Sequence, residues 1–377
     1  MKSSLSILAV LALFGCTNSS HILGVRPAPP TVRLYVYVSP AGNDSGDGTE
    51  AHPLATLAGV QDYLRALMPT ADVVVRIVSD QDPYIDQTVI WNYHNEMESG
   101  ITFEAYPDSF YACFIGTGAD TNFFTLDRHD NTPTNIHFRK LSIRRYRTGA
   151  IWFCGNRLDD AEGWNGYNSV EDCIFYEIGS QWQPEKLGCY GVIDFMNSRF
   201  NLIRGCEFRD CANAYDTGFP QSTIEADVYS THTVNAIYLS HHSTNALIID
   251  NDFSRIKGDA VRIRDESNSA EICYNSFYQV GWSGIVTMWY CHPAYGPWGY
   301  CHSALPIDEC PSWFASFHDN YAEGNWACGE SRLFYDLRPS DNEACEMPID
   351  PYRIELWNNT TGPCKDGGSE SKQDPAE

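Results

Sequence analysis

Basic residues are scarce in this chain of 377 residues. Lys and Arg together number 25, against 49 Asp and Glu, which gives a formal charge of −24. A surface this acidic repels nucleic acids and anionic membranes, so the sequence argues against nucleic acid as a partner. A polyanionic substrate would bind only where a local group of basic residues outweighs the overall field.

Long apolar runs are also missing beyond the N-terminus. The stretch from Leu5 to Phe14 is too short to cross a bilayer and follows Lys2, which is the layout of a secretory signal. Gly15 and Cys16 then resemble a bacterial lipobox in which Cys16 would be lipidated. Residues 1–16 are therefore predicted to be a signal peptide, with cleavage or lipidation of Cys16 left open. Both routes predict an extracytoplasmic protein, either secreted or held at the membrane only through Cys16.

No two of the 14 cysteines form a CxxC pair, which argues against a zinc cluster of that kind. Export favours disulfide bonds instead. An odd number of cysteines remains once Cys16 is set aside, so at least one thiol is free or intermolecular. Local partners are expected within three groups: Cys206 and Cys211; Cys328 and Cys345; and Cys291, Cys301 and Cys310.

The first part of the chain after the signal reads as a linker, a strand and a helix. Residues 17–33 form the linker, and alternating residues from Leu34 to Val38 predict a strand. Thr56 is placed to cap a helix whose apolar positions are Leu57, Val60, Leu64 and Leu67. The β-branched run "DVVVRIVSD" predicts a further strand, and residues 362–377 are expected to be a disordered tail.

From there the sequence repeats a short unit. Each unit is a strand of alternating residues, a turn rich in Asn, Asp or Gly, and a second strand with an N-x-F-like element, as in "NALIIDNDF" and "AEICYNSF". The spacing is roughly 22–25 residues, which predicts a solenoid of short strands. The Leu-x-x-Leu-x-Leu frame of leucine-rich repeats is absent, so a parallel β-helix is favoured.

Two segments resemble secreted right-handed parallel β-helix proteins of the pectate-lyase-like kind. These are "YVSPAGNDSGDGTEAHPLATL" and "NDFSRIKGDAVRIRDESNSAEICYNSF". The resemblance implies an all-β, single-stranded right-handed parallel β-helix over residues 34–361, with a helix at 57–67 that caps the coil stack. That family includes lyases, glycoside hydrolases, epimerases and proteins without a known reaction, so the resemblance does not choose an activity.

Six strands are expected to stack in register, because equivalent positions of a β-helix lie about 4.8 Å apart. They are "FFTLD", "AIWFC", "VIDFMN", "AIYLSHH", "AVRIRDE" and "GIVTMWY". Alternation makes the inward pairs uniformly apolar, for example Ile237 with Leu239 and Val261 with Ile263. The outward positions vary and are predicted to gather polar and aromatic side chains on one face. The candidate catalytic residues are Tyr238, His241, Arg262 and Arg264, and the candidate substrate-binding residues are Trp152, Asp194, Asp265 and Trp289.

Three functions compete for this face. A polysaccharide lyase would use Arg262 or Arg264 to neutralise a uronate, His241 as base and Tyr238 as acid. An inverting glycoside hydrolase would use Asp194 and Asp265, two coils or about 10 Å apart. A non-catalytic glycan-binding or structural protein would need only the salt bridges and aromatic rings. The lyase is the preferred hypothesis and a binding or structural role the alternative.

Loops, metals and partners complete the expectations. Residues 212–235 and 290–316 interrupt the repeat and are predicted to wall the face. The neighbouring His241 and His242 point to opposite faces if both lie on a strand, so no metal is expected. No clear carboxylate cluster supports calcium, and no cofactor is predicted. The expected partner is an extracellular polysaccharide, and the chain is expected to be a monomer.

Overall fold

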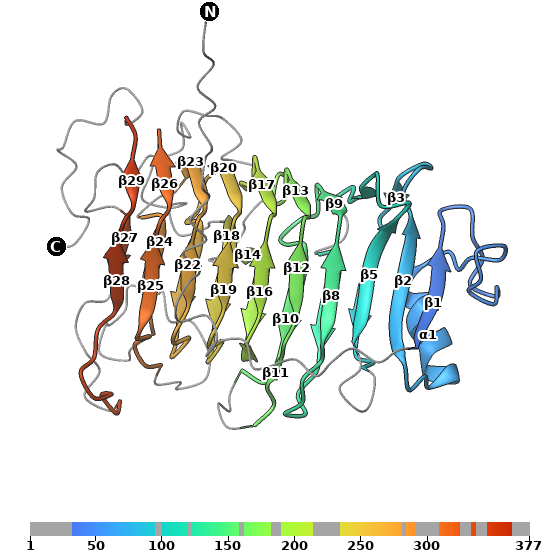
Figure 1. Ribbon diagram of the computed structural model, residues 1–377, viewed down its shortest axis with the longest axis horizontal. Coiled ribbons are helices and arrows are strands. Elements are labelled where there is room, and N and C mark those ends of the chain that lie inside the picture. The colour runs from blue at the N-terminus through green and yellow to red at the C-terminus, as the bar shows by residue number, and fades with distance from the viewer. Residues whose placement is uncertain are drawn as a thin grey trace, which may run out of the picture.

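The computed structural model describes residues 32–94, 100–118, 122–157, 162–181, 190–213, 234–280, 284–291, 309–324, 333–336 and 345–363. In these residues the chain winds through three long parallel sheets, called A, B and C, whose strands follow one another along the molecule (Figure 1). This is the right-handed parallel β-helix that the sequence predicts.

Sheet A contains ten strands, which are β1 (Arg33–Val38), β2 (Asp72–Val78), β5 (Ile101–Tyr106), β8 (Ile136–Arg139), β12 (Ser169–Glu171), β16 (Leu202–Arg204), β19 (Leu247–Ile249), β22 (Glu271–Cys273), β25 (Ala315–His318) and β28 (Ile354–Trp357). Sheet B contains nine, which are β3 (Tyr84–Ile85), β6 (Ala112–Ile115), β9 (Leu141–Arg144), β13 (Ile174–Tyr176), β17 (Glu207–Arg209), β20 (Asp252–Ile256), β23 (Ser276–Val280), β26 (Tyr321–Glu323) and β29 (Thr360–Thr361).

Sheet C contains eight strands, which are β4 (Val89–Trp91), β7 (Phe124–Asp127), β10 (Ile151–Cys154), β14 (Tyr190–Met196), β18 (Val234–Ser240), β21 (Val261–Arg264), β24 (Val286–Trp289) and β27 (Phe334–Asp336). A short fourth sheet pairs β11 (Asn165–Gly166) with β15 (Ser198–Arg199). From β2 onward the chain visits A, B and C in turn, so each coil contributes one strand to each sheet.

The register of sheet C is the predicted one. Ile237 pairs with Val261 and Leu239 with Ile263, and Val261 pairs in turn with Val286. These inward side chains are fully buried or nearly so. The same 24-residue offset joins His241 to Asp265 in the turn after the strand. The six strands expected from the sequence therefore all lie side by side in sheet C.

The N-x-F element of the repeat performs two structural tasks. Asn251, Asn275 and Asn320 form a buried ladder in which each backbone N–H donates to the side-chain oxygen of the next asparagine, at 2.9–3.2 Å. Phe253 and Phe277 stack in the core with ring centroids 5.0 Å apart. The ladder satisfies the backbone at the corner between sheets A and B, and the stack fills the interior beneath it.

The N-terminal helix α1 (Leu57–Leu67) begins where the sequence predicts. The Thr56 hydroxyl accepts a hydrogen bond from the Gly59 N–H at 2.9 Å, as an N-cap residue does. Leu57, Val60 and Leu64 belong to the core, whereas Leu67 is 47% exposed. Leu67 is the last residue of the helix, before the left-handed Met68.

Most of the expected cysteine pairs were wrong. Cys206 and Cys211 are both free and buried, because they flank strand β17 and an extended chain holds them about 15 Å apart. Cys345 bonds to Cys310 instead of Cys328. Cys291 is disulfide-bonded to a residue outside the described ones.

The expectations for the chain ends lie outside the described residues. These are the signal peptide and Cys16, most of the linker, and the tail from residue 364 onward. Most of both predicted wall loops also falls there. No helix within the described residues has the length and apolar character that crossing a membrane requires.

Candidate functional site

The outward side of sheet C carries a row of four of the candidate side chains, one per coil. Trp152, Asp194, Tyr238 and Arg262 are successive backbone partners on β10, β14, β18 and β21. We call them the first row. Neighbouring members are therefore about 4.8 Å apart at the backbone. Trp152, Asp194 and Arg262 are half-buried, whereas Tyr238 is 4% exposed. The row is the arrangement that the repeat predicts.

Arg264 lies two residues beyond Arg262 on β21 and is fixed from several sides. Its Nε donates to Oε2 of Glu309 at 2.7 Å, and its Nη2 donates to Oε1 of the same carboxylate. Its Nη1 donates to the Tyr238 hydroxyl at 3.3 Å. Hydrogen bonding and charge from Tyr238 and Glu309 outweigh the large cost of burial and raise the pKa of Arg264. The guanidinium is therefore a permanent cation directed at Tyr238.

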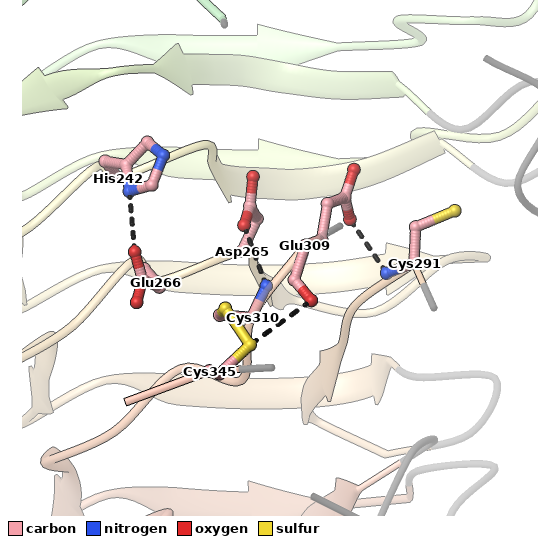
Figure 2. Close-up of a disulfide and its surroundings, with 7 residues drawn as sticks. All are labelled: His242, Asp265, Glu266, Cys291, Glu309, Cys310 and Cys345. Carbon is pink, nitrogen blue, oxygen red and sulfur yellow. Dashed lines mark hydrogen bonds and ion pairs between the residues drawn. A yellow bond between two sulfur atoms is a disulfide. The ribbon is translucent and has the colours of Figure 1, made fainter. Parts of the chain in front are cut away.

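Glu309 is the partner that the sequence did not reveal. Its side chain is 1% exposed, and Oε2 also accepts a hydrogen bond from the Cys291 N–H at 2.8 Å (Figure 2). The guanidinium of Arg157 lies 4.0 Å from its Oε1. A buried carboxylate needs such compensation, because an unpaired buried charge is very costly. Glu309 therefore holds Arg264 rather than facing a substrate.

Trp289 lies at the end of the face where Arg262 and Arg264 are found. The guanidinium carbons of Arg264 and Arg262 lie 4.3 Å and 5.3 Å from the centre of its indole ring. Such contacts align a cation with the electron-rich face of the ring. Trp289 is itself half-buried. The predicted binding residue thus also orients both arginines.

Trp152 marks the opposite end of the row. Its ring stacks on Tyr190 with centroids 5.8 Å apart, and its Nε1 donates to the Gly191 carbonyl at 3.0 Å. Gly149 makes room for the indole, since a Cβ there would lie 2.1 Å from Trp152 Nε1. Trp152 and Trp289 lie at opposite ends of the row. Half-buried, oriented aromatic rings of this kind are the usual platforms for sugar rings.

Asp194 has the most perturbed carboxyl group on this face. Its Oδ1 is enclosed and has no hydrogen-bond partner among the described residues, although the residue as a whole is only half-buried. Burial raises the pKa of Asp194 to about 7, against the opposing effects of Arg264 and a backbone hydrogen bond from Gly191. A carboxyl group with such a pKa exchanges a proton near neutral pH, which is the requirement for general acid–base chemistry.

His241 and Asp265 meet as predicted, but in a buried position. His241 Nδ1 lies 2.8 Å from Asp265 Oδ2, and the two residues are 2% and 4% exposed. Burial lowers the pKa of His241, although the hydrogen bond that it donates to Asp265 acts in the opposite direction. Burial alone would raise the pKa of Asp265, but the bond to His241 and other local contacts bring it below its usual value. The pair supports the site from within.

The turn after β18 differs from the expected continuation of the strand. The strand ends at Ser240, and both His241 and His242 have positive φ, as do Asp265 and Glu266 one coil later. His242 Nδ1 contacts Glu266 Oε2 at 3.2 Å (Figure 2). The two histidines are therefore turn residues with separate carboxylate partners, and the argument that they alternate along a strand was wrong.

The cluster of His241, Asp265 and Glu309 brings three ligand atoms within 4.8 Å of one another. Oxygens of both carboxylates in this cluster already accept hydrogen bonds. Asp265 Oδ1 accepts from the Cys310 N–H at 3.1 Å (Figure 2), and both Glu309 oxygens bond to Arg264. A cation placed here would also face the guanidinium. The donor set therefore fits an internal hydrogen-bond network better than a metal ion.

Comparisons with known proteins leave the family open. No protein-family model matches the chain, and a search of curated proteins finds no match. Among solved structures, a rhamnogalacturonan lyase is 15% identical with a TM-score of 0.38, covering 90% of this chain and 89% of that one. The Streptococcus pneumoniae surface protein and adhesin PfbA is 10% identical with a TM-score of 0.37, covering 81% and 87%.

A GH136 lacto-N-biosidase from Eubacterium ramulus is 10% identical with a TM-score of 0.29, covering 87% of this chain and 67% of that one. All of these identities and TM-scores are low. The resemblances therefore assign neither an activity nor a substrate to this chain, and the function has to be argued from the site.

Proposed function

We propose that the protein is an exported polysaccharide lyase that acts on a uronate-containing glycan along the first row of sheet C. The observation that carries the proposal is the pairing of two proton-transfer groups on adjacent strands. Asp194, whose pKa is raised to about 7, is the backbone partner of Tyr238, whose hydroxyl accepts a hydrogen bond from Arg264. Elimination needs an acid and a base held this close together.

The roles follow from the environment of each group. Tyr238 removes the C5 proton as a phenolate, a form that the neighbouring Arg264 cation stabilises, and becomes a neutral phenol in the step. The bond between C4 and the leaving oxygen breaks as the C4–C5 double bond forms. Protonated Asp194 gives its proton to that oxygen. Arg262, next to Tyr238 in the row, neutralises the uronate carboxylate.

These roles differ from the sequence-based hypothesis at four residues. Tyr238 changes from acid to base, Asp194 becomes the acid, and His241 and Arg264 no longer act on the substrate. His241 lies in the turn after β18 with its Nδ1 bonded to Asp265, whereas Tyr238 lies in the first row beside Asp194, so Tyr238 takes over the role of base. Arg264 is bound through two bonds to Glu309, so it supports Tyr238 and leaves the carboxylate to Arg262. Hydrolysis by Asp194 and Asp265 is less well supported, because Asp265 is buried against His241.

A glycan-binding role is the second candidate. It is favoured by the low exposure of Tyr238, which limits access to the base, and by the two half-buried tryptophans that frame the row. Binding would use Trp152, Arg262 and Trp289 without any reaction. A catalytic role requires the Tyr238 hydroxyl to become accessible when substrate binds.

The test is an assay of uronate and neutral polysaccharides that follows both ultraviolet absorbance of unsaturated product and new reducing ends. Asp194→Asn, Tyr238→Phe and Arg262→Gln should each lower kcat/KM by about 10²–10⁴-fold. Asp127→Asn, at an exposed outward position of the same sheet, and Tyr278→Phe, on sheet B, are matched controls that should leave the rate unchanged.

The outcomes separate the three functions. Reducing ends without absorbance would replace elimination by hydrolysis. If neither absorbance nor reducing ends appear, but the protein binds glycan and Trp152→Ala does not, the protein is a binding protein. That result would overturn the proposal of an enzyme. Unchanged rates in all three site variants would move the reaction away from this row.

A further inference from the structure

A second group of reactive side chains lies on sheet A, away from the row on sheet C. Glu271 and Cys273 are alternate residues of β22 and point to the same side, opposite the inward Ile272. His318 on the neighbouring β25 is the backbone partner of Cys273 (Figure 1). All three side chains are buried. A carboxylate, a thiol and an imidazole thus converge outside the core.

The spacing of the three ligand atoms matches a small tetrahedral ion. His318 Nε2 lies 3.3 Å from Glu271 Oε1, and Cys273 Sγ lies 3.9 Å from the same oxygen. All three ligand atoms lie within 4.8 Å of one another. Zinc bonds of about 2.0–2.3 Å place the corners of a tetrahedron about 3.3–3.7 Å apart. The two distances to Glu271 Oε1 are thus within a few tenths of an ångström of such an edge, and the third, from Nε2 to Sγ, is at most 4.8 Å.

The histidine is held in the orientation that a metal ligand requires. Its Nδ1 lies 2.8 Å from Asp319 Oδ2, which leaves Nε2 directed at Glu271 and Cys273. The imidazole also stacks on Trp357, with ring centroids 4.1 Å apart and an angle of 8° between the planes. Metal-bound histidines in proteins usually carry such a carboxylate on the second ring nitrogen.

We propose that Glu271, Cys273 and His318 form a zinc site, with Asp319 as the positioning residue and a water molecule as the fourth ligand. The thiolate selects zinc over calcium or magnesium. The site joins β22 to β25 across the insertion that separates them, since His318 lies 47 residues after Glu271. Zinc would pin these two coils together.

The alternative is a metal-free hydrogen-bond cluster in which the imidazole bridges the two carboxylates. Metal content and cobalt spectroscopy distinguish the two. Untagged full-length protein should bind one equivalent of zinc per chain after treatment with chelator and refilling. Cobalt in the same site should give a thiolate-to-metal charge-transfer band. Cys273→Ser should lose the band, and Asp319→Asn should weaken zinc binding about 10–100-fold.

Two controls address the other cysteines and histidines. Cys113→Ser changes a free cysteine on sheet B, and His241→Ala changes the histidine of the buried cluster in sheet C. Both variants should keep the stoichiometry and the band. No charge-transfer band at saturating cobalt in the folded wild type would overturn the proposal. So would a full band in Cys273→Ser, or a loss of metal in His241→Ala alone.

Discussion

Single residues in sheet C owe their chemistry to the charges around them. Asp194 and Glu309 are both acidic and both lie near Arg264, yet their hydrogen bonds differ. Glu309 bonds to the guanidinium through both oxygens, whereas Asp194 keeps one enclosed oxygen without a partner among the described residues. The same cation therefore bonds directly to one carboxylate and leaves the other near the point of protonation.

The raised pKa of Asp194 predicts a pH-dependent effect on stability. Because its pKa in the folded state, about 7, exceeds the ordinary value of 3.8, the fold favours the protonated form. That contribution is complete at low pH and is lost as pH rises through 7. Asp194→Asn should therefore gain stability over wild type above pH 7, by about 1–3 kcal/mol, and gain little at low pH.

Urea unfolding of both proteins below pH 3.8 and above pH 7 measures this difference. A stability difference between Asp194→Asn and wild type that stays constant with pH would contradict the assignment.

The sequence predicts the residues of the site better than their roles. Alternation within aligned strands places Asp194 beside Tyr238, and the 24-residue repeat places His241 beside Asp265. They cannot place Glu309, which lies within the insertion at residues 290–316, where the repeat is interrupted. The sequence also could not predict which outward side chains are buried, because the segments that cover them lie outside their own coil.

At the scale of elements, the asparagine ladder links successive coils at one corner. Asn275 is its central member and is 1% exposed. Its side-chain oxygen accepts from Asn251, and its amide nitrogen donates to the carbonyls of Ile248 and Cys273. Removing it leaves several buried backbone groups without partners, and such groups are costly.

Asn275→Ala should therefore lower the free energy of unfolding by about 2–4 kcal/mol. Asn359, half-buried beyond the last of these buried asparagines, should cost about 1 kcal/mol when changed to Ala. Thermal or urea unfolding of the two variants makes the comparison. Equal losses would mean that the ladder contributes no more in its centre than at its edge.

The disulfide between Cys310 and Cys345 acts on the site through the backbone. It closes a segment with a sequence separation of 35, and Cys310 directly follows Glu309 (Figure 2). Cys345→Ser should cost about 3–4 kcal/mol of stability by the loop-entropy estimate. It should also lower any activity on sheet C, because Glu309 and the Cys310 N–H lose their anchor.

Unfolding of Cys345→Ser, with activity measured well below its melting temperature, separates the two effects. Cys113→Ser is the control for loss of a thiol that is not in a disulfide. Full activity in a destabilised Cys345→Ser would show that the disulfide supports the fold alone.

For the whole molecule, the net charge of −24 opposes the local arginines. A polyanionic glycan is repelled at long range and attracted only near Arg262 and Arg264. Salt screens the long-range repulsion over about 10 Å at 0.1 M, while the short contacts are screened less. Moderate salt should therefore raise the association rate of a uronate polymer several-fold. Stopped-flow or surface-based kinetics would test this, and a rate that falls steadily with salt would contradict it.

The separation of an invariant interior from a variable exterior bears on how such a chain evolves. A change at an outward position of one coil alters one member of the row and leaves the stacked interior of every coil untouched. Specificity can therefore shift by single substitutions, one coil at a time, without an intermediate that fails to fold. Thr125, which continues the row beside Trp152 on β7, is the natural position at which to lengthen it by one sugar-contacting residue.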